Sequence, residues 1–111
     1  MSLALYIFIN TDLKMKPGKW GAQVGHSIQY IIENLSNKSE YTQNNYHLWR
    51  NSGARKIILK ATEKEMEKIY NSFPSEKVHD AGLNHVKAGS FTCLAVYPKE
   101  HNEDFKNFKL M

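Results

Sequence analysis

The chain of 111 residues has a single cysteine, Cys93, which excludes an internal disulfide and a paired-thiolate metal site. Its five histidines show no metal-binding spacing, so we expect no bound metal. The opening apolar run, Leu3–Ile9, is far shorter than the ~20 residues that cross a bilayer, and no basic segment precedes it as in a signal peptide. We therefore expect a cytoplasmic protein with no membrane association and with Cys93 in its core.

Internal repeats, low-complexity tracts and linkers are also absent, so we expect residues 1–111 to form a single domain. The hydrophobic content of 41% and the charged content of 23% are ordinary for a globular protein and argue against disorder. The net charge of +4 favours a polyanionic partner, because Lys and Arg displace counterions from phosphates. A basic surface that serves solubility explains the charge equally well.

Strand patterns alternate with helical patterns along the chain. Strands are predicted at Leu3–Ile9, 56–60, 77–80 and 91–97, and helices at about 18–35, 42–51 and 62–73, with a short final helix over 102–108. Thr62 and Glu65 form a capping box at the third helix. The connection after Asp80 is too short for a parallel crossover, so at least one strand pair is antiparallel. These patterns predict a layered α/β domain with a mixed sheet.

The first predicted helix has two different sides. Its apolar stripe consists of Val24, Ile28, Ile31, Ile32 and Leu35. Lys19, Gln23, His26, Ser27 and Tyr30 collect on roughly the opposite side. We therefore expect one side to face the core and the other to present an amine, an amide and an imidazole together.

The segment Thr11–His26 joins the first strand to this helix. Lys14, Lys16 and Lys19 crowd the helix start, a position that attracts anions in α/β proteins. A solvated Lys-rich turn is the alternative interpretation. The glycine spacing and the Gly-Lys-Ser/Thr ending of a Walker phosphate loop are absent.

A second polar segment, Asp80–Thr92, connects the last two strands. Asp80 stands at a strand end and is a candidate general base, although Asp at such a place also commonly caps loop amides. Ser90 and Thr92 lack the strand–turn–helix setting of a nucleophile elbow. The sequence therefore does not favour a serine-based acyl enzyme.

Both segments resemble the signatures of the peptidyl-tRNA hydrolase type 2 family. The first signature corresponds to Thr11-Asp-Leu-Lys-Met-Lys-Pro-Gly-Lys-Trp-Gly-Ala-Gln-Val-Gly-His. The second corresponds in order and spacing to Asp80-Ala-Gly, then Gly89-Ser, Thr92 and Leu94. The segment 55–61 and the closing Phe-Lys-Leu-Met also resemble the family, so the resemblance covers essentially the whole chain.

This resemblance implies a three-layer α/β domain with a four-stranded mixed β-sheet between helices, a homodimer and no cofactor. It implies hydrolysis of the ester between a peptide and the 3′ ribose of tRNA. The family's proposed functional Lys and Asp fall on Lys19 and Asp80, and Gln23 and His26 match supporting positions. Asn84 stands where the family typically has a Thr with a proposed catalytic part, which makes Asn84 the third candidate catalytic residue.

A mechanism follows as a hypothesis. Asp80 positions or deprotonates the attacking water, and Lys19 stabilises the oxyanion or holds the terminal phosphate. Backbone amides at Gly89 and Ser90 are further oxyanion donors. The tRNA phosphates are assigned to basic residues near the mouth of the site, namely Lys14, Lys16, Lys87 and Arg55. A tRNA- or RNA-binding module without turnover and a protein-interaction adaptor on the same fold remain as alternatives.

Overall fold

The structure, a computed structural model, describes residues 2–81 and 89–111. The strands are β1 (Leu3–Asn10), β2 (Lys56–Ala61), β3 (Ser75–His79) and β4 (Phe91–Glu100), and the helices are α1 (Pro17–Asn34), α2 (Glu40–Arg50) and α3 (Glu63–Ser72). Short 3₁₀ turns lie at η1 (Thr11–Leu13) and η2 (Leu35–Asn37). These four strands and three helices lie where the sequence predicts them, with ends that differ by a few residues.

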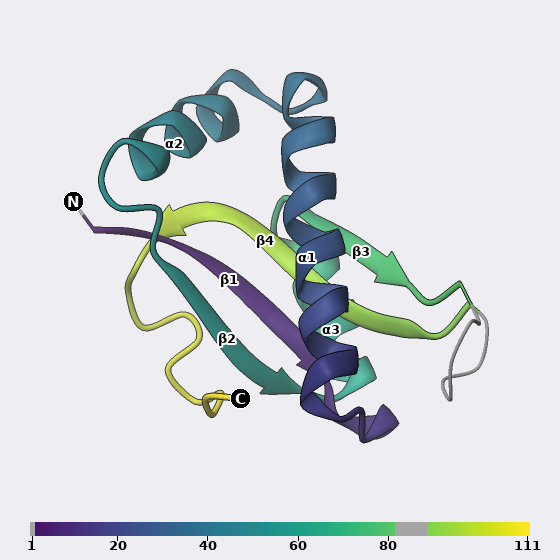
Figure 1. Cartoon of the computed structure of the whole chain (residues 1–111). Coiled ribbons are helices and arrows are strands. Elements are labelled where there is room, and N and C mark those ends of the chain that lie inside the picture. Colours follow the sequence, from purple (N-terminus) through teal and green to yellow (C-terminus); the bar gives the residue numbers. More distant parts are fainter. Residues whose placement is uncertain (1, 82–88) are drawn as a thin grey trace.

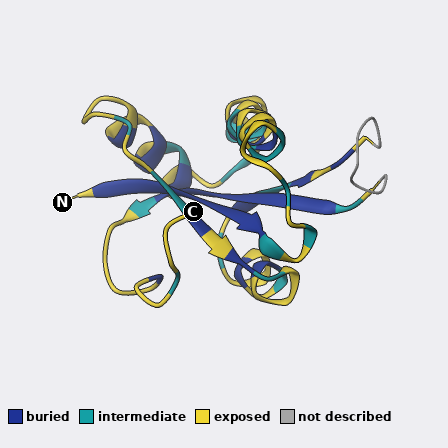
Figure 2. Cartoon of the chain, turned by 60° about the horizontal axis from the view of Figure 1, so that its bottom comes forward, coloured by how far each residue is buried: buried dark blue, intermediate teal, exposed yellow. Residues whose placement is uncertain are grey.

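The four strands form one mixed sheet in the order β2-β1-β4-β3. β1 is parallel to β2 and antiparallel to β4, which is also antiparallel to β3. Helices α1 and α2 cover one face, while α3 and the C-terminal segment cover the other (Figures 1 and 2). The prediction of a three-layer α/β fold with a four-stranded mixed sheet is therefore confirmed.

The unbroken apolar run of β1 follows from its central place in the sheet. Leu5, Ile7 and Ile9 pack in the core under α1 and α2, whereas Tyr6 and Phe8 pack on the opposite face with α3. Because both faces are covered, every residue of β1 is buried.

Cys93 lies in the core of the α1 face, as the sequence predicts. Burial raises the pKa of its thiol to about 12, and a hydrogen bond with Ser27 opposes that rise only in part. The thiolate is therefore strongly disfavoured near neutral pH, and Cys93 serves as a small core residue.

The predicted division of α1 into an apolar and a polar side is wrong in one respect. Gln23 and Ser27 are buried together with Ile31, whereas Ile32 is 56% exposed. Gln23 is drawn inward because Thr92 of β4 places a buried hydroxyl beneath the helix, and Gln23 supplies its hydrogen-bond partner. The Ser27 hydroxyl donates within its own helix to the Val24 carbonyl at 2.7 Å.

The predicted final helix is also wrong, because residues 101–108 form turns. Phe105 is 5% exposed and anchors these turns against the α3 face of the sheet. Beyond them Leu110 pairs with Leu59 in an antiparallel bridge along the outer edge of β2. The aromatic anchors and the unpaired edge of β2 outweigh the weak local helix signal.

Within residues 2–81 and 89–111, none of the helices has the length and apolar character of a membrane-spanning segment.

Candidate active site

The two polar segments meet at one end of the sheet, where β1 and β3 end and β4 begins (Figure 1). Here this edge means the row of strand ends and not an outer strand. Ile9 lies opposite Cys93, and His79 lies opposite Phe91, which places Asn10 and Asp80 at the same edge. The chain turns from the end of β1 through η1 into α1, so the start of α1 lies at this edge too. Ligands of α/β proteins commonly bind at such an edge.

Lys19 and Asp80 form an ion pair at this edge, in which Lys19 Nζ donates to Asp80 Oδ1. The Asp80 side chain is 3% exposed and that of Lys19 is 16% exposed. The carboxylate is thus held away from bulk water, while the Lys19 side chain keeps a small exposure to solvent. The structure brings together two of the three predicted catalytic residues, and the third, Asn84, lies outside the described residues.

The backbone around Asp80 is held in place by two hydrogen bonds. The Asp80 amide donates to the Ser90 carbonyl at 2.9 Å, and the Gly89 amide donates to the Asp80 carbonyl at 2.8 Å. Gly89 has φ +82°, a left-handed conformation that glycine adopts without strain. Because its amide is engaged with Asp80, Gly89 does not supply the oxyanion donor that the sequence analysis expected, whereas the half-buried Ser90 remains a candidate.

A second contact fixes the same side of α1 one helical turn further on. The Thr92 hydroxyl lies 2.7 Å from Gln23 Oε1 and 3.1 Å from the Val78 carbonyl oxygen, and its single proton is shared between these acceptors. Because Gln23 follows Lys19 by four residues, this contact holds α1 to β4 one turn away from Lys19, on the same side of the helix. Thr92 is not among the site residues predicted from the sequence, although its hydroxyl stands out inside the apolar run of β4.

Asn10 is a second buried polar residue that is absent from the predicted site. It is 1% exposed, and its Nδ2 donates to the Phe91 carbonyl at 2.7 Å and to Glu63 Oε1 at 3.2 Å. Its Oδ1 accepts from the Asp12 amide at 2.9 Å. Asn10 therefore ties the end of β1 to the start of β4 and to α3, which makes this edge of the sheet rigid. A polar residue that ends a buried strand is the signal for this role.

The loop after β1 carries the predicted basic groups. Thr11 donates to the Ala61 carbonyl at 3.1 Å, and Asp12 Oδ2 accepts from the Glu63 amide at 3.0 Å. Lys14 and Lys16 are exposed, and neither takes part in an ion pair within residues 2–81 and 89–111. These two ammonium groups remain available to an anionic ligand beside a loop that is held by its neighbours.

The other predicted site residues fall in three groups. His26 is exposed on α1, and in the described structure its side chain takes part in no hydrogen bond or ion pair with Lys19 or Asp80. Asn84 and Lys87 lie outside the described residues. Arg55 is misassigned, because its carbonyl accepts from the Leu5 amide near the start of β1. At ~3.3 Å per strand residue, that is roughly 17 Å from the edge where Asn10 lies.

Among the described residues, no group of three or more His, Cys, Asp or Glu side chains is placed to hold a metal ion. The chemistry that the described residues offer at this edge is that of a carboxylate, an ammonium, an amide and backbone dipoles.

The fold and the Lys19–Asp80 pair define a class: a small α/β protein with a mixed four-stranded sheet and a largely buried Lys–Asp pair at the ends of its strands. Residues 3–110 match the family model described as "Peptidyl-tRNA hydrolase PTH2". The chain belongs to this family, and the resemblance read from its two signatures is confirmed.

Relatives from several archaea are similar over most of their length. A peptidyl-tRNA hydrolase from Haloquadratum walsbyi is 34% identical, with 83% of this chain and 82% of the relative covered. One from Methanococcus maripaludis strain C7 is 33% identical, with 87% and 86% covered. One from Methanococcus vannielii is 30% identical, with 95% and 96% covered. The match therefore extends over nearly the whole domain and is not confined to the two signatures.

Proposed function

We propose that this protein is a peptidyl-tRNA hydrolase, which cleaves the ester between a peptide and the 3′ ribose of tRNA and so releases tRNA for reuse. One observation carries the proposal: Lys19 and Asp80, from two segments far apart in the sequence, form a largely buried ion pair at this end of the sheet. Family membership over residues 3–110 supports the reaction class. The names of the relatives favour an enzyme over the alternative of a binding module.

In the proposed reaction, Asp80 accepts a proton from a water molecule whose oxygen attacks the ester carbonyl carbon. The Lys19 ammonium, which already contacts the Asp80 carboxylate, stabilises the negative oxygen of the tetrahedral intermediate. When the intermediate collapses, the carbon–oxygen bond to the ribose breaks and the proton passes to the leaving 3′ hydroxyl. The products are the tRNA and the peptide with a new carboxylic acid, which releases its remaining proton to solvent, and no covalent enzyme intermediate forms.

The remaining assignments follow from exposure and sequence. The exposed Lys14 and Lys16 bind phosphates of the tRNA end beside the ion pair, and His26 and Lys87 are further candidates for this contact. Gln23 keeps its supporting part through its hydrogen bond with Thr92. Asn84 takes the place of the family Thr, and its amide either orients the water or binds the oxyanion.

The test is release of peptide from a peptidyl-tRNA whose amino terminus is blocked. Lys19→Met and Asp80→Asn are each expected to lower kcat/KM by at least ~10², because each removes a group that acts on the transition state. Lys64→Met is the matched control, since Lys64 is an exposed lysine on α3 on the other face of the sheet. Circular dichroism checks that every variant is folded.

Two results would argue against this assignment. Turnover near that of the wild type in a folded Asp80→Asn or Lys19→Met variant removes that residue from the mechanism. Absence of peptide release by the wild-type protein, together with binding of uncharged tRNA, replaces the hydrolase with a tRNA-binding module.

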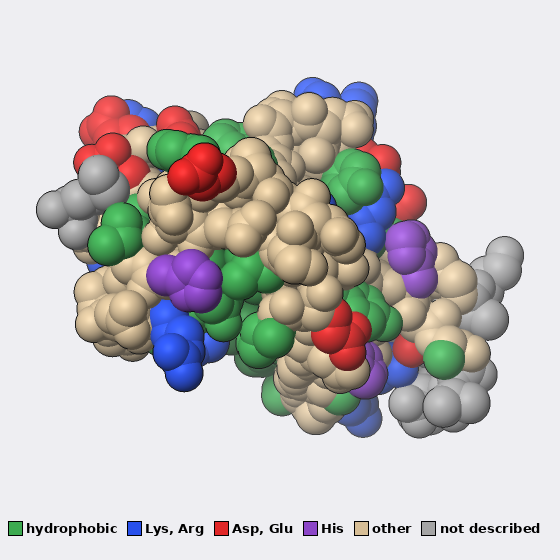
Figure 3. All heavy atoms as spheres, turned by 90° about the horizontal axis from the view of Figure 1, so that it is seen from above, with side chains coloured by type: hydrophobic (Ala, Val, Ile, Leu, Met, Phe, Trp, Pro, Cys, Tyr) green, Lys and Arg blue, Asp and Glu red, His purple; other side chains and the backbone are tan. Residues whose placement is uncertain are grey.

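We also propose that the protein acts as a homodimer in the cytoplasm, where its substrate arises in translation. Seen from the end where α2 lies, hydrophobic side chains reach the surface in several places (Figure 3). Ile32 of α1 is 56% exposed, and Tyr41 and Leu48 of α2 are 75% and 57% exposed, so large apolar side chains of both helices are accessible to a partner. Sedimentation equilibrium tests this proposal, and a monomer at micromolar concentration contradicts it.

A further inference from the structure

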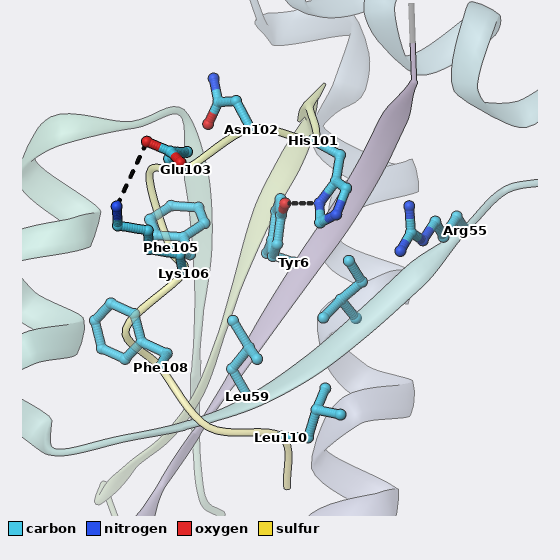
Figure 4. Close-up of a pocket in the computed structure, with 11 residues that line it drawn as sticks. Tyr6, Arg55, Leu59, His101, Asn102, Glu103, Phe105, Lys106, Phe108 and Leu110 are labelled. Carbon is cyan, nitrogen blue, oxygen red and sulfur yellow. Dashed lines mark hydrogen bonds and ion pairs between the residues drawn. The ribbon is translucent and has the colours of Figure 1, made fainter.

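Arg55 has no part in the candidate active site, yet it lines a distinct pocket of about 380 Å³ on the opposite face of the sheet. The floor of this pocket is formed by the sheet through Tyr6, Ile57 and Leu59, and the wall by the C-terminal segment 101–110 (Figure 4). Its volume lies toward the lower end of the range for small-molecule sites, roughly 300–1,000 Å³.

The inner part of the pocket is aromatic and held in place by its own contacts. Phe105 packs edge-on against Tyr6, with ring centroids 4.8 Å apart and planes at 72°. Phe108 packs edge-on against Phe8 at 5.2 Å. These contacts fix the Phe105 and Phe108 rings at the apolar wall, a lining that suits a flat apolar body.

Among the described residues, the charged side chains around the pocket are paired except for Arg55. Glu103 pairs with Lys106 at 3.5 Å, and Asp104 pairs with Lys99 at 2.7 Å, so both neighbouring acids are already engaged. Within residues 2–81 and 89–111, the Arg55 guanidinium makes no ion pair or side-chain hydrogen bond. Figure 4 shows it turned toward Tyr6 and His101 at one end of the pocket.

Two polar groups stand beside this guanidinium. The Tyr6 hydroxyl and His101 Nδ1 are hydrogen-bonded at 2.5 Å, and this bond fixes the orientation of both side chains. Burial raises the pKa of the Tyr6 hydroxyl, and the positive charge of Arg55 acts against this rise. The end of the pocket at Arg55 is therefore polar and positively charged, while the end at Leu59 and Phe108 is apolar.

We infer that this pocket binds a small aromatic carboxylate, with the carboxylate on Arg55 and the ring against Phe105 and Phe108. The planar guanidinium offers two parallel N–H donors that match the two oxygens of a carboxylate. The apolar floor and wall take the ring out of water. The site is separate from the Lys19–Asp80 pair, and the inference does not depend on the proposed hydrolysis.

The probe is 2-naphthoate, and 2-naphthamide is its uncharged match of nearly the same shape. Binding is measured by isothermal titration calorimetry and located by amide chemical-shift changes. We expect 2-naphthoate to bind with shifts centred on residues 55–59 and 101–110, and 2-naphthamide to bind at least about tenfold more weakly, since a charge-assisted bond is lost.

Arg55→Gln is expected to raise the Kd for 2-naphthoate at least about tenfold. Arg50→Gln is the control with the same change of charge, because Arg50 is exposed at the C-terminal turn of α2, and it should leave the Kd unchanged. Peptide release from peptidyl-tRNA should be unchanged in Arg55→Gln.

Three outcomes overturn the inference. The first is no binding of 2-naphthoate at millimolar concentration, and the second is binding that Arg55→Gln or loss of the carboxylate charge does not weaken. The third is a loss of tRNA binding in Arg55→Gln, which assigns Arg55 to the nucleic acid instead. None of these bears on the Lys19 and Asp80 variants, so failure here is distinguishable from failure of the proposed function.

Discussion

At the scale of single residues, the polar side chains inside the core carry information that hydrophobic patterns miss. Thr92 is fully buried, and Asn10 and Gln23 are 1% and 4% exposed, yet each has a hydrogen-bond partner. A pattern of apolar spacing treats such residues as surface, which is why Gln23 and Ser27 were placed on the wrong side of α1. Lys19 and Asp80 were found because their signatures are specific, whereas Thr92 and Asn10 require the three-dimensional neighbours.

The contact between Thr92 and Gln23 allows a residue-scale prediction. Thr92→Val keeps the side-chain shape but removes the hydroxyl, so the buried Gln23 amide loses a partner. We expect the free energy of unfolding to fall by about 1–3 kcal/mol, measured by urea denaturation. Gln23→Leu in the Thr92→Val background should recover part of that loss, because it removes the unsatisfied group.

If the contact also positions Lys19, the folded Thr92→Val variant should lose kcat with little change in KM. Additive effects of the two substitutions on stability would show that the side chains are not coupled.

At the scale of elements, local signals were sufficient where they did not compete with tertiary contacts. The capping box at α3 is present as predicted: the Thr62 hydroxyl accepts from the Glu65 amide at 3.2 Å, and the Glu65 carboxylate accepts from the Thr62 amide at 2.8 Å. The expected final helix does not form, because the packing of Phe105 and the bridge of Leu110 to β2 hold that segment in turns against the sheet. A local sequence pattern of about ten residues does not contain these partners, because they are far away along the chain.

The capping box leads to an element-scale prediction. Thr62→Ala removes the acceptor for the Glu65 amide at the first turn of α3. We expect a loss of about 1 kcal/mol in the free energy of unfolding, measured by urea denaturation. Ser72→Ala, at the other end of the helix, removes an exposed hydroxyl that donates to the Lys68 carbonyl and should change stability by less than about 0.5 kcal/mol. Equal losses for the two variants would contradict a specific role of the cap.

At the scale of the whole molecule, the two faces of the sheet carry different features. The face under α1 and α2 carries the Lys19–Asp80 pair and the basic loop after β1, and the face under α3 carries the pocket of Arg55. The α/β class followed from the order of strand and helix patterns. The position of Arg55 did not, because it depends on the parallel pairing of β2 with β1, which places the start of β2 at the far end of the sheet.

The distribution of charge leads to the last prediction. If Lys14 and Lys16 bind tRNA phosphates, each contact releases counterions, so the logarithm of the binding constant falls with the logarithm of salt concentration. Replacing both by Gln removes two contacts and should make this slope shallower by roughly 1.4–1.8, at about 0.7–0.9 for each contact. The control is Lys64→Gln with Lys68→Gln, which makes the same change of net charge on exposed positions of α3. Fluorescence anisotropy of labelled tRNA between 50 and 200 mM salt, a range over which such slopes are well resolved, measures the difference. A slope that changes equally in the two double variants reports net charge alone, whereas a change confined to Lys14 and Lys16 places the tRNA beside the Lys19–Asp80 pair.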